Sequence, residues 1–212
     1  MSGDMEQTAT AREPDHGAAA ARPSDHGMAT RGAATRVALL EAAREVFVTR
    51  GFAEAGVTDV VRRAEASVGS LYHHFSGKAD LYLTLFDEFQ QRQTQRTGDA
   101  VRVARAAGET DPMPLFLAGA RAYLEGCLEE RDLAALFLRG DAPPGFEVTM
   151  RDRLREWARR TAALFEHEDA LVVVVTGALA AVVQEVTLSE DPVAARRVVE
   201  EALVLIGGIR RP

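Results

Sequence analysis

A chain of 212 residues can hold one large domain or two small ones, and its 47% hydrophobic content is ordinary for a folded soluble protein. The single cysteine excludes an internal disulfide, and the first 30 residues lack the basic start and apolar core of a secretory leader. The longest apolar run, residues 170–183, is shorter than the ~20 residues of a membrane span, so we expect a cytoplasmic protein without membrane contact.

The net charge of −7 is unevenly distributed along the chain. Residues 1–30 carry −3 and residues 81–212 carry −5, whereas residues 31–80 have seven basic and six acidic groups and carry +1. This distribution excludes a broad positive surface. Any contact with a polyanion therefore has to rest on a few placed side chains.

Residues 1–32 contain glycine, proline, alanine, serine and aspartate without apolar periodicity, which predicts a disordered N-terminal arm. An imperfect ten-residue repeat, ARxxDHGxA, occurs twice within it, at 11–19 and 21–29. From Val37 to Phe47 apolar residues recur at helical spacing, which predicts a helix over residues 35–50. Thr35 is expected to cap this helix and Gly51 to end it.

Residues 57–78 contain two short helical patterns joined by a tight turn. In the first pattern, residues 57–64, valines and an alanine form one apolar face, and Ser67 is expected to cap the second, residues 68–74. Leu71 and Phe75 point inward, as do Phe47 and Phe52. The other face of the second helix carries small, hydroxyl, aromatic and imidazole groups: Gly69, Ser70, Tyr72, His73 and His74. This arrangement is the helix-turn-helix pattern, whose second helix enters a DNA major groove.

The pattern from Phe47 to Leu81 resembles the TetR family of bacterial transcriptional repressors. The matching residues are Phe47-x-x-x-Gly51-Phe52, Val60-Val61-x-x-Ala64 and Gly69-Ser70-Leu71-Tyr72-x-His74-Phe75-x-x-Lys78-x-x-Leu81. The chain departs from the family at Glu65, where glycine is usual in the turn, and at Gly56, where threonine or serine often caps the first motif helix. Glu65 is expected to fit if that helix ends without a left-handed residue.

The resemblance implies a DNA-binding domain over residues 33–80, with base contacts from the start of the second motif helix: Val68, Gly69 and Ser70. It also implies contacts to phosphates or neighbouring bases from Thr35, Arg36, Thr58, Arg62, Tyr72, His73 and Lys78. Arg62 and Arg63 could instead be solvated, and His74 is better explained as a buried, hydrogen-bonded histidine. The arm is expected to be a solvated linker, with a minor-groove contact by Arg22 and Arg31 as the alternative.

Residues 81–212 are predicted to form a helical body, which gives an all-α protein of about nine helices. The helix that opens at Lys78 is expected to break or kink at Gly98, and a proline, Pro112 or Pro114, starts the next one. The last two helices, residues 170–189 and 192–208, have apolar faces that one chain cannot cover. They predict a homodimer, and two-fold symmetry then predicts a palindromic operator in double-stranded DNA.

A body of this size that does not touch DNA suggests an unknown small-molecule effector, and the resemblance implies a repressor released by a small apolar ligand. The expected lining of the cavity is Phe86, Phe89, Phe116, Tyr123, Phe137, Trp157 and Phe165, with Thr176, Gln184 or Gln93 as polar anchors. Each aromatic residue could instead simply fill a core.

Motifs of enzymes are not found in the sequence: it has no serine elbow, no glycine-rich phosphate loop and no spaced metal ligands. No catalytic residue, metal or cofactor is therefore predicted. The alternative is a helical scaffold, or an enzyme-like protein that binds a small molecule without an operator. A scaffold explains the last two helices but not the polar face of the motif.

Overall fold

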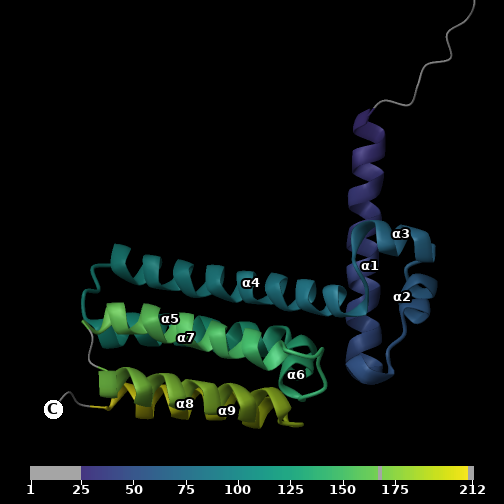
Figure 1. The fold of residues 1–212 in the computed structure, drawn as a ribbon. Coiled ribbons are helices and arrows are strands. Elements are labelled where there is room, and N and C mark those ends of the chain that lie inside the picture. The colour runs from purple at the N-terminus through teal and green to yellow at the C-terminus, as the bar shows by residue number, and fades with distance from the viewer. Residues whose placement is uncertain (1–24, 167–168, 210–212) are drawn as a thin grey trace, which may run out of the picture.

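The computed structural model describes residues 25–166 and 169–209, and within these ranges every regular element is an α-helix (Figure 1). These described ranges contain nine helices in chain order: α1 (Asp25–Glu54), α2 (Val57–Arg63), α3 (Val68–His74), α4 (Lys78–Ala106), α5 (Pro112–Glu129), α6 (Arg131–Leu138), α7 (Phe146–Leu164), α8 (Asp169–Leu188) and α9 (Pro192–Gly207). The prediction of an all-α fold is confirmed.

Helix α1 begins ten residues before the predicted start. Residues 25–32 therefore belong to a helix and not to the arm, while the rest of the predicted arm, with Arg22, lies outside the described residues. Thr35 is not a cap, because it lies inside α1 and its hydroxyl donates to the Arg31 carbonyl at 3.0 Å. Gly51 does interrupt the helix, with a φ of 80° that favours glycine.

Helices α1, α2 and α3 pack into a small head around one apolar core. Leu39, Phe47, Val60 and Leu71 are fully or almost fully buried there, and Phe75 closes the end of α3. Phe52 packs on this core against Phe47 and Tyr82. The prediction that these aromatic residues belong to the core is confirmed. Their packing holds α3 on α1.

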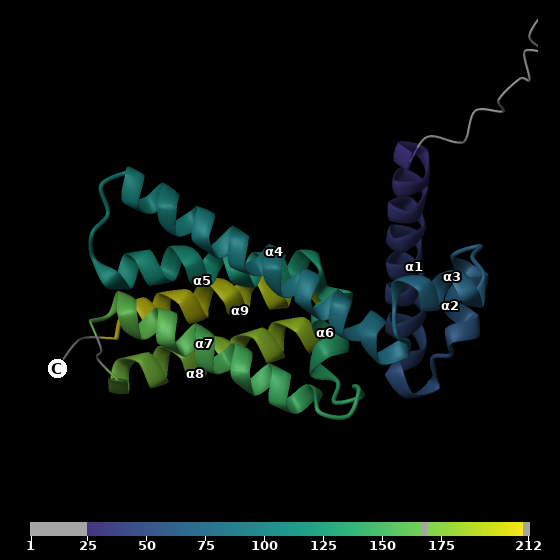
Figure 2. The same cartoon turned by 45° about the horizontal axis from the view of Figure 1, so that its top comes forward.

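Helix α4 leaves the head across α1 and runs the length of the body (Figures 1 and 2). It continues without a break through Gly98, so the predicted kink is wrong. A single exposed glycine costs a helix only about 1 kcal/mol. The packing of α5 along α4 is enough to hold the helix straight through it.

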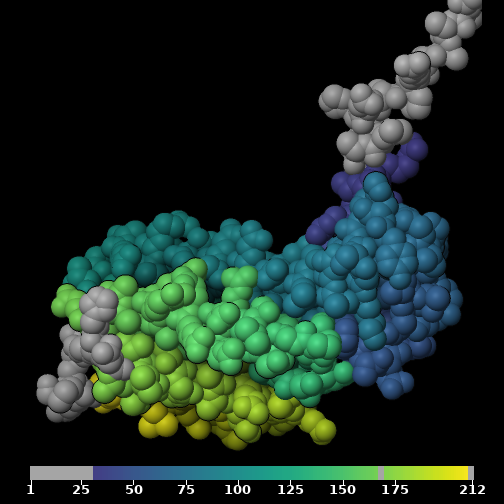
Figure 3. Space-filling view, viewed as in Figure 1, coloured from purple at the N-terminus to yellow at the C-terminus, as the bar shows by residue number. Residues whose placement is uncertain are grey.

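The body is a bundle of α4 to α9, in which α8 and α9 lie together on the side away from α4 (Figure 1). Its second core cluster includes Leu124, Phe165, Val175 and Leu203. The space-filling view shows the head standing beyond one end of this body (Figure 3). The two parts are joined by α4 and by contacts between α1 and α6.

Helix α8 is long and apolar enough to cross a membrane by length and composition alone. Over Ala170–Leu188 its mean hydropathy is 2.1, so the expectation that this segment is too short for a span is wrong. The helix continues five residues past the apolar run counted in the sequence. It packs against α5, α6, α7 and α9, as the core helix of a soluble protein also does, and 44% of the segment is buried.

Candidate functional site

The two helices of the motif are capped by different means. Gly56 precedes α2, and its N–H donates to the Asp59 carboxylate at 3.3 Å, which is one half of a capping box. Ser67 precedes α3, and its hydroxyl accepts the Ser70 N–H at 3.0 Å, as predicted. Both helices are only seven residues long, so these local bonds matter for their stability.

The turn between α2 and α3 contains a left-handed residue. Glu65 has a φ of +51°, so the expectation that this turn avoids the left-handed region is wrong. The Ala66 N–H donates to the Val61 carbonyl at 2.9 Å across the turn, a bond that closes the end of α2. The fold therefore requires the same backbone geometry that a glycine would supply, and imposes it on glutamate.

Helix α3 lies on the side of α1 away from the body (Figures 1 and 2). Val68 is 43% exposed and Tyr72 is 57% exposed, while Leu71 between them is fully buried. Gly69 and His73 are exposed, and Ser70 and His74 are half-buried. On α2, Thr58 and Arg62 are exposed as well. The α3 residues expected to contact DNA are therefore free to be reached, with Ser70 the least accessible.

Two of the expected phosphate contacts are engaged inside the protein. The Lys78 ammonium donates to the carbonyls of Phe52 and Ala53 at 2.7 and 3.1 Å and lies 4.4 Å from the centre of the Phe52 ring. The Arg36 guanidinium lies 3.4 Å from Glu88 and 5.3 Å from the Phe75 ring. Lys78 thus has a structural reason to stand at the start of α4, because it binds carbonyls at the end of α1.

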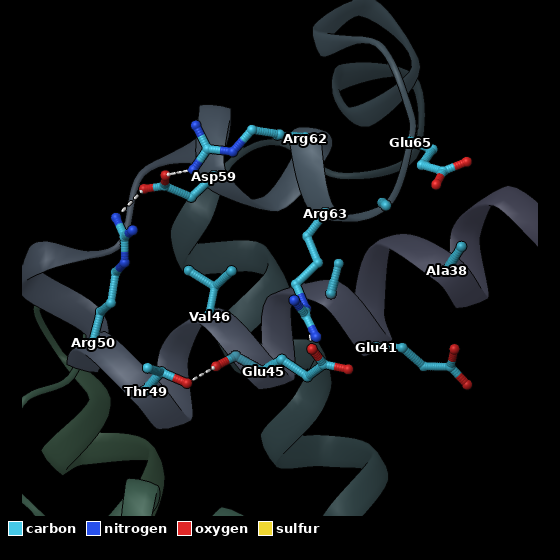
Figure 4. Close-up of a pocket in the computed structure, with 12 residues that line it drawn as sticks. Ala38, Glu41, Glu45, Val46, Thr49, Arg50, Asp59, Arg62, Arg63 and Glu65 are labelled. Atoms are coloured by element: carbon cyan, nitrogen blue, oxygen red, sulfur yellow. Dashed lines mark hydrogen bonds and ion pairs between the residues drawn. The ribbon is translucent and has the colours of Figure 1, made fainter.

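An open groove of about 800 Å³ lies between α1 and α2 (Figure 4). Its charged side chains pair across it: Arg50 of α1 lies 2.9 Å from Asp59 of α2, and Arg63 of α2 contacts Glu45 of α1. Arg62 also pairs with Asp59. These ion pairs hold α2 on α1, and they neutralise much of the positive charge that the head could offer to a ligand.

The body binds α1 through residues that no local sequence pattern identifies. The Asp141 carboxylate, in the loop after α6, accepts the Ala53 N–H at 3.0 and 3.2 Å. Arg44 of α1 forms two bonds of 2.9 Å with Asp132 of α6. A Cβ at Gly51 would collide with the Asp141 carboxylate, so glycine is needed there for space as well as for φ.

A cavity of about 250 Å³ lies inside the body and is bounded by α4, α5, α6, α7 and α8. Four of the residues predicted to line a ligand cavity do so: Phe89, Tyr123, Phe137 and Trp157. Gln93, weighed as a polar anchor, also lines it. Because the cavity touches both α4 and α6, it borders the two helices that contact the head.

The other predicted lining residues do not line this cavity. Phe86 packs on Phe137 and Phe146 in the core nearer the head, whereas Phe116 and Phe165 pack on each other in the second core cluster. The Thr176 hydroxyl donates to the Val172 carbonyl at 2.6 Å within α8. Gln184 is exposed on α8. Helical periodicity identifies inward residues but not the layer of the bundle that each one reaches.

Aliphatic side chains on α8 and α9 remain exposed in the single chain. We call this set the α8/α9 face: Val173, Val174, Val193, Val204 and Leu205, of which Val174, the least exposed, is still 52% exposed. Exposed apolar patches on a folded protein mark interaction surfaces. The two helices predicted to mediate self-association thus carry five of the exposed aliphatic side chains.

The comparisons with known proteins concern mainly the head. Residues 39–85 match the family model described as bacterial regulatory proteins, tetR family. The HTH-type transcriptional activator FasR of Mycolicibacterium smegmatis is 44% identical over 66 residues, which cover 31% of this chain and 28% of FasR. The transcriptional regulator AcuR of Cereibacter sphaeroides is 29% identical over 141 residues, which cover 62% of this chain and 61% of AcuR. The chain thus spans less than two thirds of either relative.

Solved structures extend the likeness of the fold to the body. A transcriptional regulator from Aquifex aeolicus superposes with a TM-score of 0.64 at 18% identity, covering 81% of this chain and 99% of that one. The fatty acid degradation regulator FadR from Bacillus halodurans gives a TM-score of 0.66 at 16% identity, covering 84% and 96%. The match over residues 39–85 and the geometry of α2 and α3 thus identify the head as a DNA-binding domain of the tetR family of bacterial regulatory proteins, and the solved structures show that the body shares the fold of such regulators.

Proposed function

We propose that the protein regulates transcription by binding a palindromic DNA operator as a homodimer in the cytoplasm. The observation that carries the proposal is the polar face of α3, which is exposed on the far side of a rigidly packed head. A helix held in this way can enter a major groove without rearrangement of the head. The small net charge of the head predicts an affinity that depends on a few placed contacts.

The start of α3 reads bases in this proposal, through Val68, Gly69 and Ser70. Val68 offers an apolar contact such as a thymine methyl, and Gly69 lets the backbone approach closely. Tyr72, His73 and Thr58 contact phosphates or flanking bases. Thr35, Arg36, Arg62 and Lys78 are weaker contacts, because each already has a partner within the protein.

The homodimer forms through the α8/α9 face, with α8 and α9 of two chains in a four-helix interface. This arrangement removes from water the aliphatic side chains that one chain leaves exposed. A two-fold axis then places two α3 helices one or more DNA turns apart, so the operator is an inverted repeat.

A small, mostly apolar ligand in the body cavity releases the operator, so the protein acts as a repressor. The support is the position of the cavity, which borders α4, the helix that carries the head. A ligand that binds one tilt of α4 better than another shifts the population of heads spaced for DNA. The relative FasR is described as an activator. Sequence identity in the head therefore does not by itself decide between repression and activation.

Selection of bound DNA from a random duplex pool tests this function. The expected result is an enriched inverted repeat, bound by two chains in gel shifts and in light scattering. A helical scaffold, or a protein that binds only a small molecule, would enrich no duplex. A monomer, or a pool without any enriched sequence, contradicts the proposal.

A further inference from the structure

The chemistry of the cavity wall restricts the kind of molecule that the cavity can hold. An apolar cavity of about 150 Å³ accommodates benzene. A cavity of about 250 Å³ therefore suits roughly ten non-hydrogen atoms by the same ratio. The wall includes aromatic and thioether groups: Phe89, Phe137, Trp157 and Met150. Such walls favour a flat, polarisable ligand, because aromatic rings gain from edge and stacking contacts.

Among the described residues, every charged side chain on the wall of this cavity already has a partner of opposite charge. Arg153 lies 2.7 Å from Asp87, and Arg160 lies 3.0 Å from Glu156. All four are substantially exposed, so they stand at the rim. A ligand carboxylate would have to break one of these pairs or give up its hydration without compensation. The wall therefore disfavours an anionic ligand.

The polar groups deeper in the cavity are neutral. Burial raises the pKa of the Cys127 thiol to about 12, with the Tyr123 hydroxyl beside it. Burial also raises the pKa of the Tyr123 phenol above its usual value. Both groups are therefore protonated at pH 7 and supply no charge that could bind an ion.

One buried acceptor on this wall lacks a hydrogen bond within the described structure. Gln93 is 1% exposed, and its amide nitrogen lies 3.4 Å from Glu130, but its carbonyl oxygen has no partner. That oxygen is pressed against Gly126 of α5, where an added Cβ would collide with it. An unsatisfied buried carbonyl costs free energy that a ligand O–H or N–H can recover. For this oxygen to accept a hydrogen bond from a ligand, the side chain has to turn away from Gly126 toward the cavity.

We propose that the cavity binds a neutral aromatic molecule of about ten non-hydrogen atoms that carries one hydrogen-bond donor, with Gln93 as its acceptor. An alkyl phenol has this chemistry. The inference rests on the proposed function only in treating this cavity as the effector site, and it names the class of effector.

Three probes of similar size test the inference on the full-length chain: 4-propylphenol, its methyl ether and 4-ethylbenzoate. Trp157 is the single tryptophan of the chain and lines the cavity, so its fluorescence reports binding, with calorimetry as a second measurement. We expect the phenol to bind about tenfold more tightly than the ether, the size of one hydrogen bond. We expect the benzoate to bind more weakly than the phenol.

Gln93→Met keeps the length of the side chain and removes the acceptor, while Glu130 retains its three bonds to Arg92. It should reduce affinity for the phenol to that for the ether. Gln90→Met is the matched control, because Gln90 also lines the cavity but is only half-buried. This variant should keep the preference for the phenol.

Equal binding of phenol and ether by the unmodified protein would overturn the inference without any variant. So would a benzoate that binds as well as the phenol, or the absence of binding by all three probes. No DNA is present in these titrations. A failure here is therefore distinct from a failure to select an operator.

Discussion

Glu65, in the turn between α2 and α3, has a backbone conformation that favours glycine. A left-handed conformation costs a residue with a Cβ about 1–2 kcal/mol. Glu65→Gly removes this cost but adds freedom to the unfolded chain, worth about 0.4–1 kcal/mol in the opposite direction. We expect a net gain in the free energy of unfolding of about 0.5–1 kcal/mol, measured by urea denaturation.

Glu54→Gly is the control for this prediction. Glu54 is also an exposed glutamate of the head, but its φ is not positive. Glycine there only adds unfolded-state freedom, so the variant should be less stable than the parent. Stabilisation by both substitutions would show that loss of a negative charge, and not the backbone, is responsible.

Asp59 determines how much charge the head can present to DNA. Burial works to raise its pKa, but hydrogen bonds from Arg62 and Gly56 and the nearby charge of Arg50 hold the pKa below its usual value. It is therefore ionised at neutral pH and holds both arginines. Asp59→Asn can still accept the Gly56 N–H but frees Arg62 for a phosphate. We expect tighter DNA binding, with a salt slope steeper by about 0.9 for each additional phosphate that the freed side chains neutralise.

Glu54→Gln changes the net charge of the head by the same amount at an exposed position near the end of α1. It should strengthen DNA binding slightly and leave the salt slope almost unchanged, because it frees no arginine of α2. Gel shifts over a range of salt concentrations measure both quantities. Identical slopes for the two variants would mean that Arg62 does not contact the duplex.

At the scale of elements, the backbone groups of Phe52 and Ala53 are one place where the end of α1 is held. Lys78 binds the carbonyls of Phe52 and Ala53, and Asp141 accepts the Ala53 N–H from the other side. Asp141→Ala leaves that N–H to water, and the partial exposure of the site limits the cost to about 1 kcal/mol. We expect faster hydrogen exchange at the Ala53 amide and a smaller free energy of unfolding.

Asp141→Asn retains an acceptor oxygen without the charge, and should therefore lie between the parent and Asp141→Ala in both measurements. Without the bond from Ala53 to Asp141, the loop after α6 would be an ordinary surface connection. If exchange at Ala53 were unaffected by either substitution, the carboxylate would not hold the end of α1 in solution.

The elements that sequence could predict are those whose causes are local. Helix α9 begins at Pro192, as predicted, and the Asp191 carboxylate before it accepts the N–H groups two and three residues away. Likewise Ser67 and the exposed face of α3 follow from residues within one turn. The carbonyl groups that bind Lys78 lie 25 and 26 residues before it, and no local pattern predicts them. Glu65 belongs to the same class, since packing of α2 and α3 on α1 imposes its φ.

The lining of the cavity likewise could not be predicted from local sequence, because it depends on how the helices pack. Phe89 and Phe86 both point inward from α4, yet only Phe89 reaches the cavity. The layer that each residue occupies depends on the crossing of α4 with α6 and α7, which periodicity in one helix does not contain. The exposed aliphatic side chains of α8 and α9 were predictable, because an apolar helix needs cover on several sides.

At the scale of the whole molecule, the proposed function requires two chains, and the α8/α9 face is where they would join. Val204 on α9 is 74% exposed in the single chain, so Val204→Arg should cost the fold of one chain little. In a dimer formed through this face the same change would bury two arginines without partners, which is strongly unfavourable. We expect a folded monomer by light scattering and circular dichroism.

Val103→Arg is the matched control, because Val103 is 64% exposed but lies near the end of α4, away from the α8/α9 face. It should remain dimeric and bind the selected operator normally. The monomeric Val204→Arg chain keeps an intact α3, so it should still bind a half-site weakly, but it should lose the high affinity that comes from two linked heads. A Val204→Arg protein that stays dimeric and binds the full site would place the interface on another surface. Because α3 is unchanged in both variants, the comparison separates assembly from base recognition.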